Sequence, residues 1–98
     1  MAKKNARYVI VRTHSAGVFA GIFVSRKGQE VVLADVTRIW YWSGAASLSQ
    51  LAVEGTKDPA NCKFSVVVPR EELLQAIEIL DVSPATKQSI LAVKPWKQ

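Results

Sequence analysis

The chain has 98 residues, of which 49% are hydrophobic and 21% charged, and its formal net charge is +5 at pH 7. This length accommodates one domain with a modest core, and the composition is that of a globular chain and excludes a disordered one. No apolar run approaches the roughly 20 residues of a membrane-spanning helix or resembles a secretory signal, so we expect a cytoplasmic single domain over 1–98, with a flexible basic N-terminus at 1–6.

The first 42 residues predict an antiparallel meander of three or four strands. Glycine-containing turns separate the runs, and Gly17 accepts a positive φ at no steric cost. Gly21 interrupts the second run and indicates a bulge or the close approach of another backbone. A kink is expected at Asp35. The predicted strands span residues 8–13, 18–25, 30–33 and 37–42.

Helices and strands alternate after residue 42. Ser43 is a good N-cap and Gly55 a good C′ residue for a first helix, and Pro69 is acceptable at the first position of another. Residues 76–82 fit a helix or a strand, and we favour a strand. The predicted elements are a helix at 43–55, a strand at 63–68, a helix at 69–75, a strand near 76–82 and a helix from Ser83-Pro84 that ends before Pro95.

These elements predict an α+β fold with a small antiparallel sheet of about five strands and two or three short helices. The last helix is expected to carry Ile90, Leu91 and Val93 into the core, and Trp96 to pack back onto the sheet.

Candidate catalytic and metal-binding residues are few. A single cysteine, Cys62, and a single histidine, His14, exclude an internal disulfide and a zinc site built on several such ligands. No pair of carboxylates and no nucleophile–base set is placed for catalysis. We therefore expect no enzyme, no metal and no cofactor; a Cys62–His14 nucleophile pair is the less favoured alternative.

The segment 38–46, with the sequence RIWYWSGAA, is unusual because aromatic, cationic and small residues follow one another. Strand alternation places Arg38, Trp40 and Trp42 on one face and Ile39 and Tyr41 on the other. Aromatic faces suit a nucleotide base and an arginine suits a phosphate.

Small residues follow the aromatic ones at the predicted start of the first helix, where free N–H groups favour an anion. The candidate ligand-binding residues are Arg12, Arg38, Trp40, Tyr41, Trp42, Ser43, Gly44, Ala45, Ser47 and Phe64. The alternative is a pair of core tryptophans with small residues chosen for close packing.

Positive charge is concentrated in the first part of the chain. Six cations precede the first acidic residue, Glu30, and they are Lys3, Lys4, Arg7, Arg12, Arg26 and Lys27. Such asymmetry suggests an anionic partner, so binding of nucleic acid or a host protein is a second interpretation beside nucleotide binding. A third is a structural component of a virion. The alternative to an anionic partner is a solubilising tail and two solvated residues of a hairpin turn.

The chain resembles a family of small proteins common in bacteriophages and prophages and mostly without an assigned function. The stretches that carry the resemblance are YVIVRT at 8–13, SAGVFAG at 15–21, RIWYWSGAASLSQLA at 38–52, NCKF at 61–64 and VKPW at 93–96. It extends to phage anti-defence proteins of the Thoeris anti-defence sponge type. That resemblance implies a non-catalytic homo-oligomer, with ligand pockets between protomers, that sequesters cyclic ADP-ribose isomers or cyclic oligonucleotides in the infected bacterial host.

Overall fold

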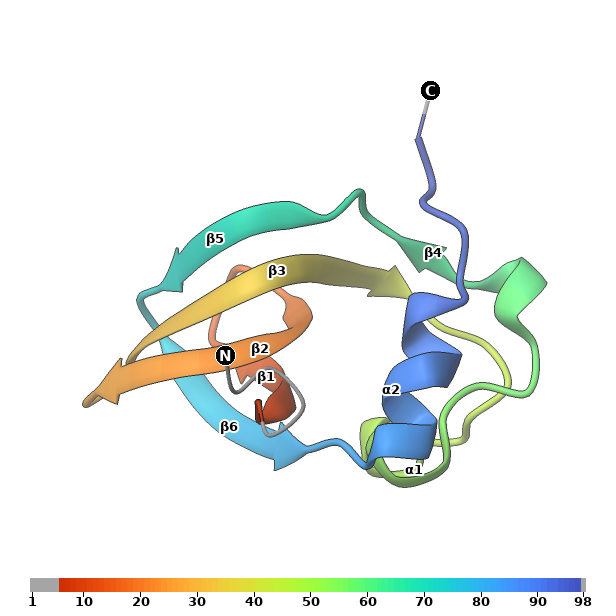
Figure 1. The fold of residues 1–98 in the computed structure, drawn as a ribbon, viewed down its shortest axis with the longest axis horizontal. Coiled ribbons are helices and arrows are strands. Elements are labelled where there is room, and N and C mark those ends of the chain that lie inside the picture. The colour runs from red at the N-terminus through yellow and green to blue at the C-terminus, as the bar shows by residue number, and fades with distance from the viewer. Residues whose placement is uncertain (1–5, 98) are drawn as a thin grey trace.

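The computed structural model describes residues 6–97. The predicted flexible N-terminus lies outside them except for Ala6. The structure has six strands, two α-helices and one short 3-10 helix (Figure 1). In chain order the elements are β1 (Tyr8–Thr13), β2 (Val18–Lys27), β3 (Glu30–Tyr41), α1 (Leu48–Glu54), η2 (Pro59–Asn61), β4 (Lys63–Phe64), β5 (Val68–Leu73), β6 (Ala76–Asp81) and α2 (Pro84–Leu91). The predicted α+β class with an antiparallel sheet is confirmed.

The sheet is antiparallel and curls into a partly open barrel. β1 pairs with β2 and β6, and β3 pairs with β2 on one side. On its other side, β3 pairs with β5 along its first half and with β4 at its end. β5 and β6 therefore lie at opposite ends of the strand order, yet only two residues connect them, so the sheet must curve to bring them together (Figure 1).

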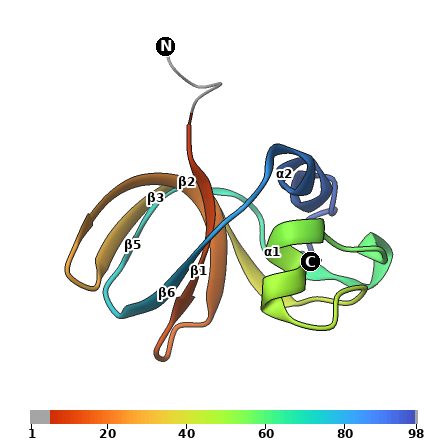
Figure 2. The same cartoon turned by 90° about the horizontal axis from the view of Figure 1, so that it is seen from below.

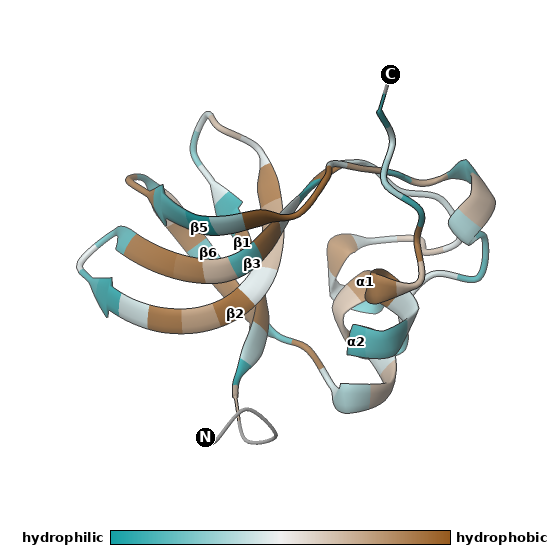
Figure 3. Ribbon diagram, turned by 45° about the horizontal axis from the view of Figure 1, so that its top comes forward, coloured by the Kyte–Doolittle hydropathy of each residue, from teal (hydrophilic) through white to brown (hydrophobic). Residues whose placement is uncertain are grey.

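Each face of the sheet buries its own core. The inner core is enclosed by the strands alone and consists of Val9, Val11, Phe19, Val31, Leu33, Val36, Leu73 and Ala76. The outer core lies between the sheet and the helices, which stand on one side of the barrel (Figure 2). It consists of Tyr8, Ile10, Ala20, Ile39, Leu51, Ala52, Cys62, Phe64, Ile90 and Val93. β1 contributes alternate residues to both, which explains the hydrophobic stretches along the strands (Figure 3).

Two irregularities give the central strands their curvature. The β2–β3 register shifts between Ala20 and Ile22, and a Cβ on Gly21 would lie 3.1 Å from the carbonyl oxygen of Ala34. The predicted bulge and close backbone approach are therefore both confirmed. The predicted kink at Asp35 is also present, with φ of 50°, but β3 continues through it as one strand.

The predicted helix at 69–75 is wrong, because this segment is strand β5. An edge strand tolerates Pro69, which lacks an N–H group, and Pro69 falls opposite the Asp35 bulge in the pairing with β3. Charged side chains such as Glu72 point to solvent, as is common on edge strands. The predicted strand at 63–68 is also shortened, since β4 ends at Phe64 and Val66 is exposed.

Both α-helices follow the hydrophobic spacing of the sequence, with two corrections. α1 buries Leu51 and Ala52 as expected, but it begins at Leu48 and not at Ser43. α2 has the predicted N-cap at Ser83 and buries Ile90, whereas Leu91 is 51% exposed, so its prediction as a core residue is wrong. No helix in residues 6–97 is long and apolar enough to span a membrane.

Candidate ligand-binding site

The end of β3 exposes its aromatic side chains. Ile39 is buried in the outer core, whereas Trp40 is 64% and Tyr41 53% exposed. The pairing with β4 shifts between Ile39 and Tyr41, so two steps along β3 match one step along β4, and Trp40 is the additional residue of a bulge. A bulge breaks the period of two, which is why Tyr41 does not share the buried face of Ile39 as alternation predicts.

Trp40 forms a stacked pair with Trp96. The ring centroids are 6.4 Å apart and the planes differ by 21°, while both side chains stay more than half exposed. The backbone N–H of Trp96 donates to the carbonyl of Phe64 (2.8 Å), and Pro95 bridges the same residue, so the C-terminal segment lies along β4. Lys63 Nζ lies 5.0 Å from the centroid of the Trp96 ring. We call Trp40, Tyr41, Lys63 and Trp96 the tryptophan surface.

A hollow of about 280 Å³ adjoins Trp40, and we call it the tryptophan hollow. It is lined by Ala16, Gly17, Val18, Arg38, Ile39, Trp40 and Trp42. Arg38, Trp40 and Trp42 therefore line one hollow, but Ile39 lines it too, so the hollow does not separate the two faces that alternation assigns. Trp42 is only partly buried and also packs against the outer core.

Arg38 separates this hollow from a larger one of about 480 Å³, which we call the Phe19 hollow. Its lining residues are Thr13, Ala16, Phe19, Arg38, Glu71, Glu72, Leu73, Leu74 and Gln75. The guanidinium carbon of Arg38 lies 4.8 Å from the centroid of the Phe19 ring. Within residues 6–97, Arg38 forms no ion pair with a carboxylate.

The segment that follows Trp42 packs against the protein and does not form the first turn of a helix. Ser43 Oγ donates to Asp58 Oδ2 (3.0 Å), and Gly44 has φ of 84°. A Cβ on Gly44 would lie 2.5 Å from the backbone nitrogen of Asp58, so this glycine is required by the adjacent loop. Ala45 packs against the outer core. The prediction that Ser43 caps the helix is therefore wrong.

The N-cap of α1 is Ser47, whose Oγ accepts from the backbone N–H of Gln50 (3.1 Å). Gln50 Oε1 in turn accepts from the N–H of Ala46 (2.7 Å). These side chains occupy donors that a ligand was expected to use. The Ser-x-x-Gln spacing of a capping box was the signal in the sequence that pointed to Ser47.

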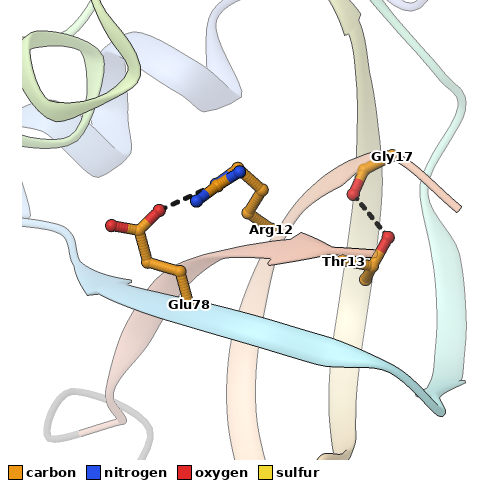
Figure 4. Close-up of polar contacts among 4 residues, drawn as sticks. All are labelled: Arg12, Thr13, Gly17 and Glu78. Atoms are coloured by element: carbon orange, nitrogen blue, oxygen red, sulfur yellow. Dashed lines mark hydrogen bonds and ion pairs between the residues drawn. The ribbon is translucent and has the colours of Figure 1, made fainter. Parts of the chain in front are cut away.

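Two other predicted site residues lie away from the tryptophan surface. Phe64 is 2% exposed and belongs to the outer core, so a ligand cannot reach its ring. Arg12 Nε donates to Glu78 Oε1 on β6 (2.9 Å), while the neighbouring Thr13 Oγ1 donates to the carbonyl of Gly17 (2.8 Å) (Figure 4).

The cations of the first part of the chain are partly neutralised. Arg7 pairs with Asp81 (2.6 Å), as Arg12 does with Glu78, and Arg26 Nη1 donates to the carbonyl of Gly28. Lys3 and Lys4 lie outside the described residues. Asp81 and Glu78 on β6 thus neutralise two of these cations, which lowers the net attraction of the basic segment for an anion.

Sequence reasoning missed Lys63 and Trp96 as site residues, because they join Trp40 only through the pairing of β4 with β3 and with the C-terminal segment. Cys62 and His14 are placed on different elements, one in the outer core and the other in the exposed turn after β1. Within residues 6–97 no group of three or more potential metal ligands is found.

Comparison with known proteins shows which family the chain belongs to. A family model described as a domain of unknown function, DUF6948, matches residues 6–90. No curated protein and no solved structure matches the chain. Because the family model covers well over half of the sequence, the chain belongs to the DUF6948 family.

Proposed function

We propose that the protein is a non-catalytic binding protein for a small anionic nucleotide, which it holds at the tryptophan surface and the adjoining tryptophan hollow. In this proposal it is phage-encoded and sequesters a cyclic nucleotide immune signal, either a cyclic ADP-ribose isomer or a cyclic oligonucleotide. The biological role rests on the resemblance of the sequence to phage anti-defence proteins, whereas the ligand class rests on the chemistry of the surface.

The observation that carries the proposal is the exposure of the stacked pair Trp40 and Trp96. Large aromatic side chains usually bury most of their area, and an exposed aromatic cluster marks an interaction site more often than chance placement does. Indole faces stack on bases, and a phosphate attached to the base needs a counter-charge nearby. Lys63 lies beside the Trp96 ring, and Arg38 lines the same hollow as Trp40.

The size of the tryptophan hollow supports an assembly of more than one copy. Pockets that enclose a small ligand measure roughly 300–1,000 Å³ and cover most of its surface. A hollow of about 280 Å³ is just below that range, and Trp40 in its lining is 64% exposed. We therefore propose a homo-oligomer in which a second copy covers the ligand.

The test is titration of the purified protein with AMP, cyclic ADP-ribose, cyclic di-AMP and cyclic tri-AMP. Calorimetry and quenching of tryptophan fluorescence measure binding, and light scattering measures the number of copies. We expect at least one ligand to bind in the micromolar range or tighter. Absence of binding by every member of the panel contradicts the proposal.

Matched variants assign the site. Trp40→Ala and Arg38→Gln are expected to weaken binding at least about tenfold, which corresponds to about 1.4 kcal/mol. Val24→Ala removes another apolar side chain that is more than half exposed, on β2, and Arg26→Gln removes one cation at the far end of the β2–β3 hairpin. Both controls should bind with unchanged affinity.

Binding to single-stranded nucleic acid is the second candidate, and the openness of the tryptophan surface favours it. Proteins of that kind stack successive bases on exposed aromatic rings beside cations. Affinity for a single-stranded oligonucleotide should then exceed that for every mononucleotide and fall with salt, with a log–log slope near −0.7 for each phosphate neutralised. If a cyclic nucleotide instead binds more tightly than the oligonucleotide and its affinity depends little on salt, the result favours the cyclic-nucleotide proposal.

A further inference from the structure

We infer that the Phe19 hollow is a second subsite of the same ligand and takes a neutral, hydroxyl-bearing group, so that the ligand is a nucleotide carrying a sugar beyond its phosphate. This inference rests on the proposed function. It concerns the Phe19 hollow, whose lining includes none of the residues of the tryptophan surface.

Continuity of the two hollows is the first step. Both are lined by Ala16 and Arg38, so the tryptophan hollow and the Phe19 hollow meet at this pair of residues. Ala16 has the smallest side chain that a non-glycine residue provides and lies in the exposed turn after β1. A ligand longer than one nucleotide can therefore extend from Trp40 past Arg38 toward Phe19.

The position of Arg38 is the second step. Its guanidinium lies over the Phe19 ring, and no carboxylate within residues 6–97 pairs with it. A guanidinium presents several donors in a fixed plane and suits a phosphate better than an ammonium group does. Among the described residues, Arg38 is the one cationic residue in the lining of either hollow, so we expect the phosphate to lie beside it.

Charge in the Phe19 hollow decides which group lies beyond the phosphate. Glu71 and Glu72 line this hollow, and Glu72 is already paired with Arg70 (2.8 Å). Carboxylates repel a second phosphate but accept hydrogen bonds from hydroxyl groups, as acidic residues do when they recognise a ribose. Gln75 adds an amide at the same rim.

Apolar surface completes the match. Leu74 is 64% exposed at the edge of this hollow and presents apolar surface to a ligand, whereas Phe19 and Leu73 are 1% and 5% exposed and offer almost none. A sugar has an apolar C–H face and a polar rim, and it therefore fits a site with one exposed apolar side chain and acceptors around it.

The experiment compares AMP, ADP and linear ADP-ribose by calorimetry, because ADP-ribose is ADP with a ribose on its terminal phosphate and one negative charge fewer. We expect ADP-ribose to bind at least about tenfold tighter than ADP. The double variant Glu71→Gln/Glu72→Gln should reduce the affinity for ADP-ribose to that for ADP and leave the affinity for AMP unchanged. Glu30→Gln, an exposed acidic residue at the β2–β3 turn, is the control and should change neither.

Failure of this inference is distinguishable from failure of the proposed function. If AMP binds but ADP-ribose binds no better than ADP, the sugar subsite is disproved and the nucleotide site remains. If none of the three binds but a cyclic nucleotide of the earlier panel does, the inference is disproved and the proposed function remains; if no cyclic nucleotide binds either, both are lost. Gln75→Ala serves as a second variant should the double variant unfold: a loss of affinity for ADP-ribose alone supports the subsite, and an equal loss for all three ligands contradicts it.

Discussion

The inner and outer cores stand on opposite faces of one sheet and differ in chemistry. The inner core contains only apolar side chains from strands that are neighbours in the sheet. The outer core contains the Tyr8 hydroxyl and the Cys62 thiol, and it depends on segments drawn from 45–64 and from the C-terminal part of the chain. Cys62 Sγ contacts Ser43 and Thr56, and the Tyr8 hydroxyl has no hydrogen-bond partner within the described residues.

This difference separates the scaffold from the site. The inner core is built without the helices, because every inner-core residue belongs to β1, β2, β3, β5 or β6. The outer core instead anchors β4 and the C-terminal segment, and these elements bring Lys63 and Trp96 to Trp40. Damage to the inner core should therefore reduce global stability, and damage to the outer layer should affect the site first.

The largest effect is expected in the inner core. Leu33 is fully buried, so Leu33→Ala should lower the free energy of unfolding by about 2–5 kcal/mol. Trp40→Ala should cost less than about 1 kcal/mol, because its side chain is mostly exposed. Urea denaturation measures both. Equal losses for the two variants would show that Trp40 belongs to the core and would break the comparison.

The loop of the outer layer comes next. Gly44→Ala should destabilise by about 3 kcal/mol, because alanine at positive φ is strained and its Cβ would meet the backbone of Asp58. Gly28→Ala separates the two causes: its φ is 63°, and the added Cβ meets nothing within 4 Å. That control should cost only about 1 kcal/mol. Similar losses for the two variants would remove the close approach at Gly44 as an explanation.

Tyr8 is expected to make the free energy of unfolding depend on pH in the alkaline range. Burial and then the charge of Asp35 raise the pKa of Tyr8 to about 12 from 10.0. Because the unfolded phenol loses its proton first, stability is complete below pH 10 and declines between pH 10 and 12, by up to about 2–3 kcal/mol. Tyr8→Phe should abolish this part of the decline and leave stability at pH 7 within about 1 kcal/mol, since the hydroxyl has no partner in residues 6–97.

Thermal unfolding from pH 8 to 12 measures the effect of Tyr8. Tyr41→Phe alters an exposed tyrosine at the end of β3 and is the control. If the stability of the wild type and of Tyr8→Phe declines in parallel as the pH rises, the ionisation of Tyr8 is not the cause of the decline.

A smaller effect is expected at the start of α1. Ser47→Ala removes the N-cap and should cost about 1 kcal/mol. Ser43→Ala removes the hydrogen bond to Asp58 without touching the cap, so the helical signal in circular dichroism should fall only for Ser47→Ala. A larger loss of helical signal in Ser43→Ala would support the prediction that the helix begins at Ser43.

The smallest effect is expected outside both cores. Arg12 and Glu78 form a pair whose side chains are 51% and 43% exposed, so Arg12→Gln should change stability by less than about 1 kcal/mol. The variant should also bind nucleotides like the wild type if the site lies at Trp40. Weaker nucleotide binding by Arg12→Gln would extend the site to β1.

Local signals in the sequence predicted the elements that local physics decides. Alternation and turn glycines located β1, β2 and β3, and Ser83 marked the start of α2. The same reasoning failed at Pro69, because a proline followed by acidic residues is acceptable both at a helix start and in a charged edge strand. Only pairing with β3 distinguishes these two states.

For the candidate site, the sequence by itself determined that aromatic and cationic residues meet near Trp40, since Arg38 and Trp42 each lie two residues from it in the chain. Tertiary structure alone decided which of them are accessible, because a bulge at Trp40 and the two-residue strand β4 override simple alternation. It also decided that Trp96, 56 positions along the chain, completes the pair. Contacts between residues so far apart depend on sheet pairing, and no local pattern records them.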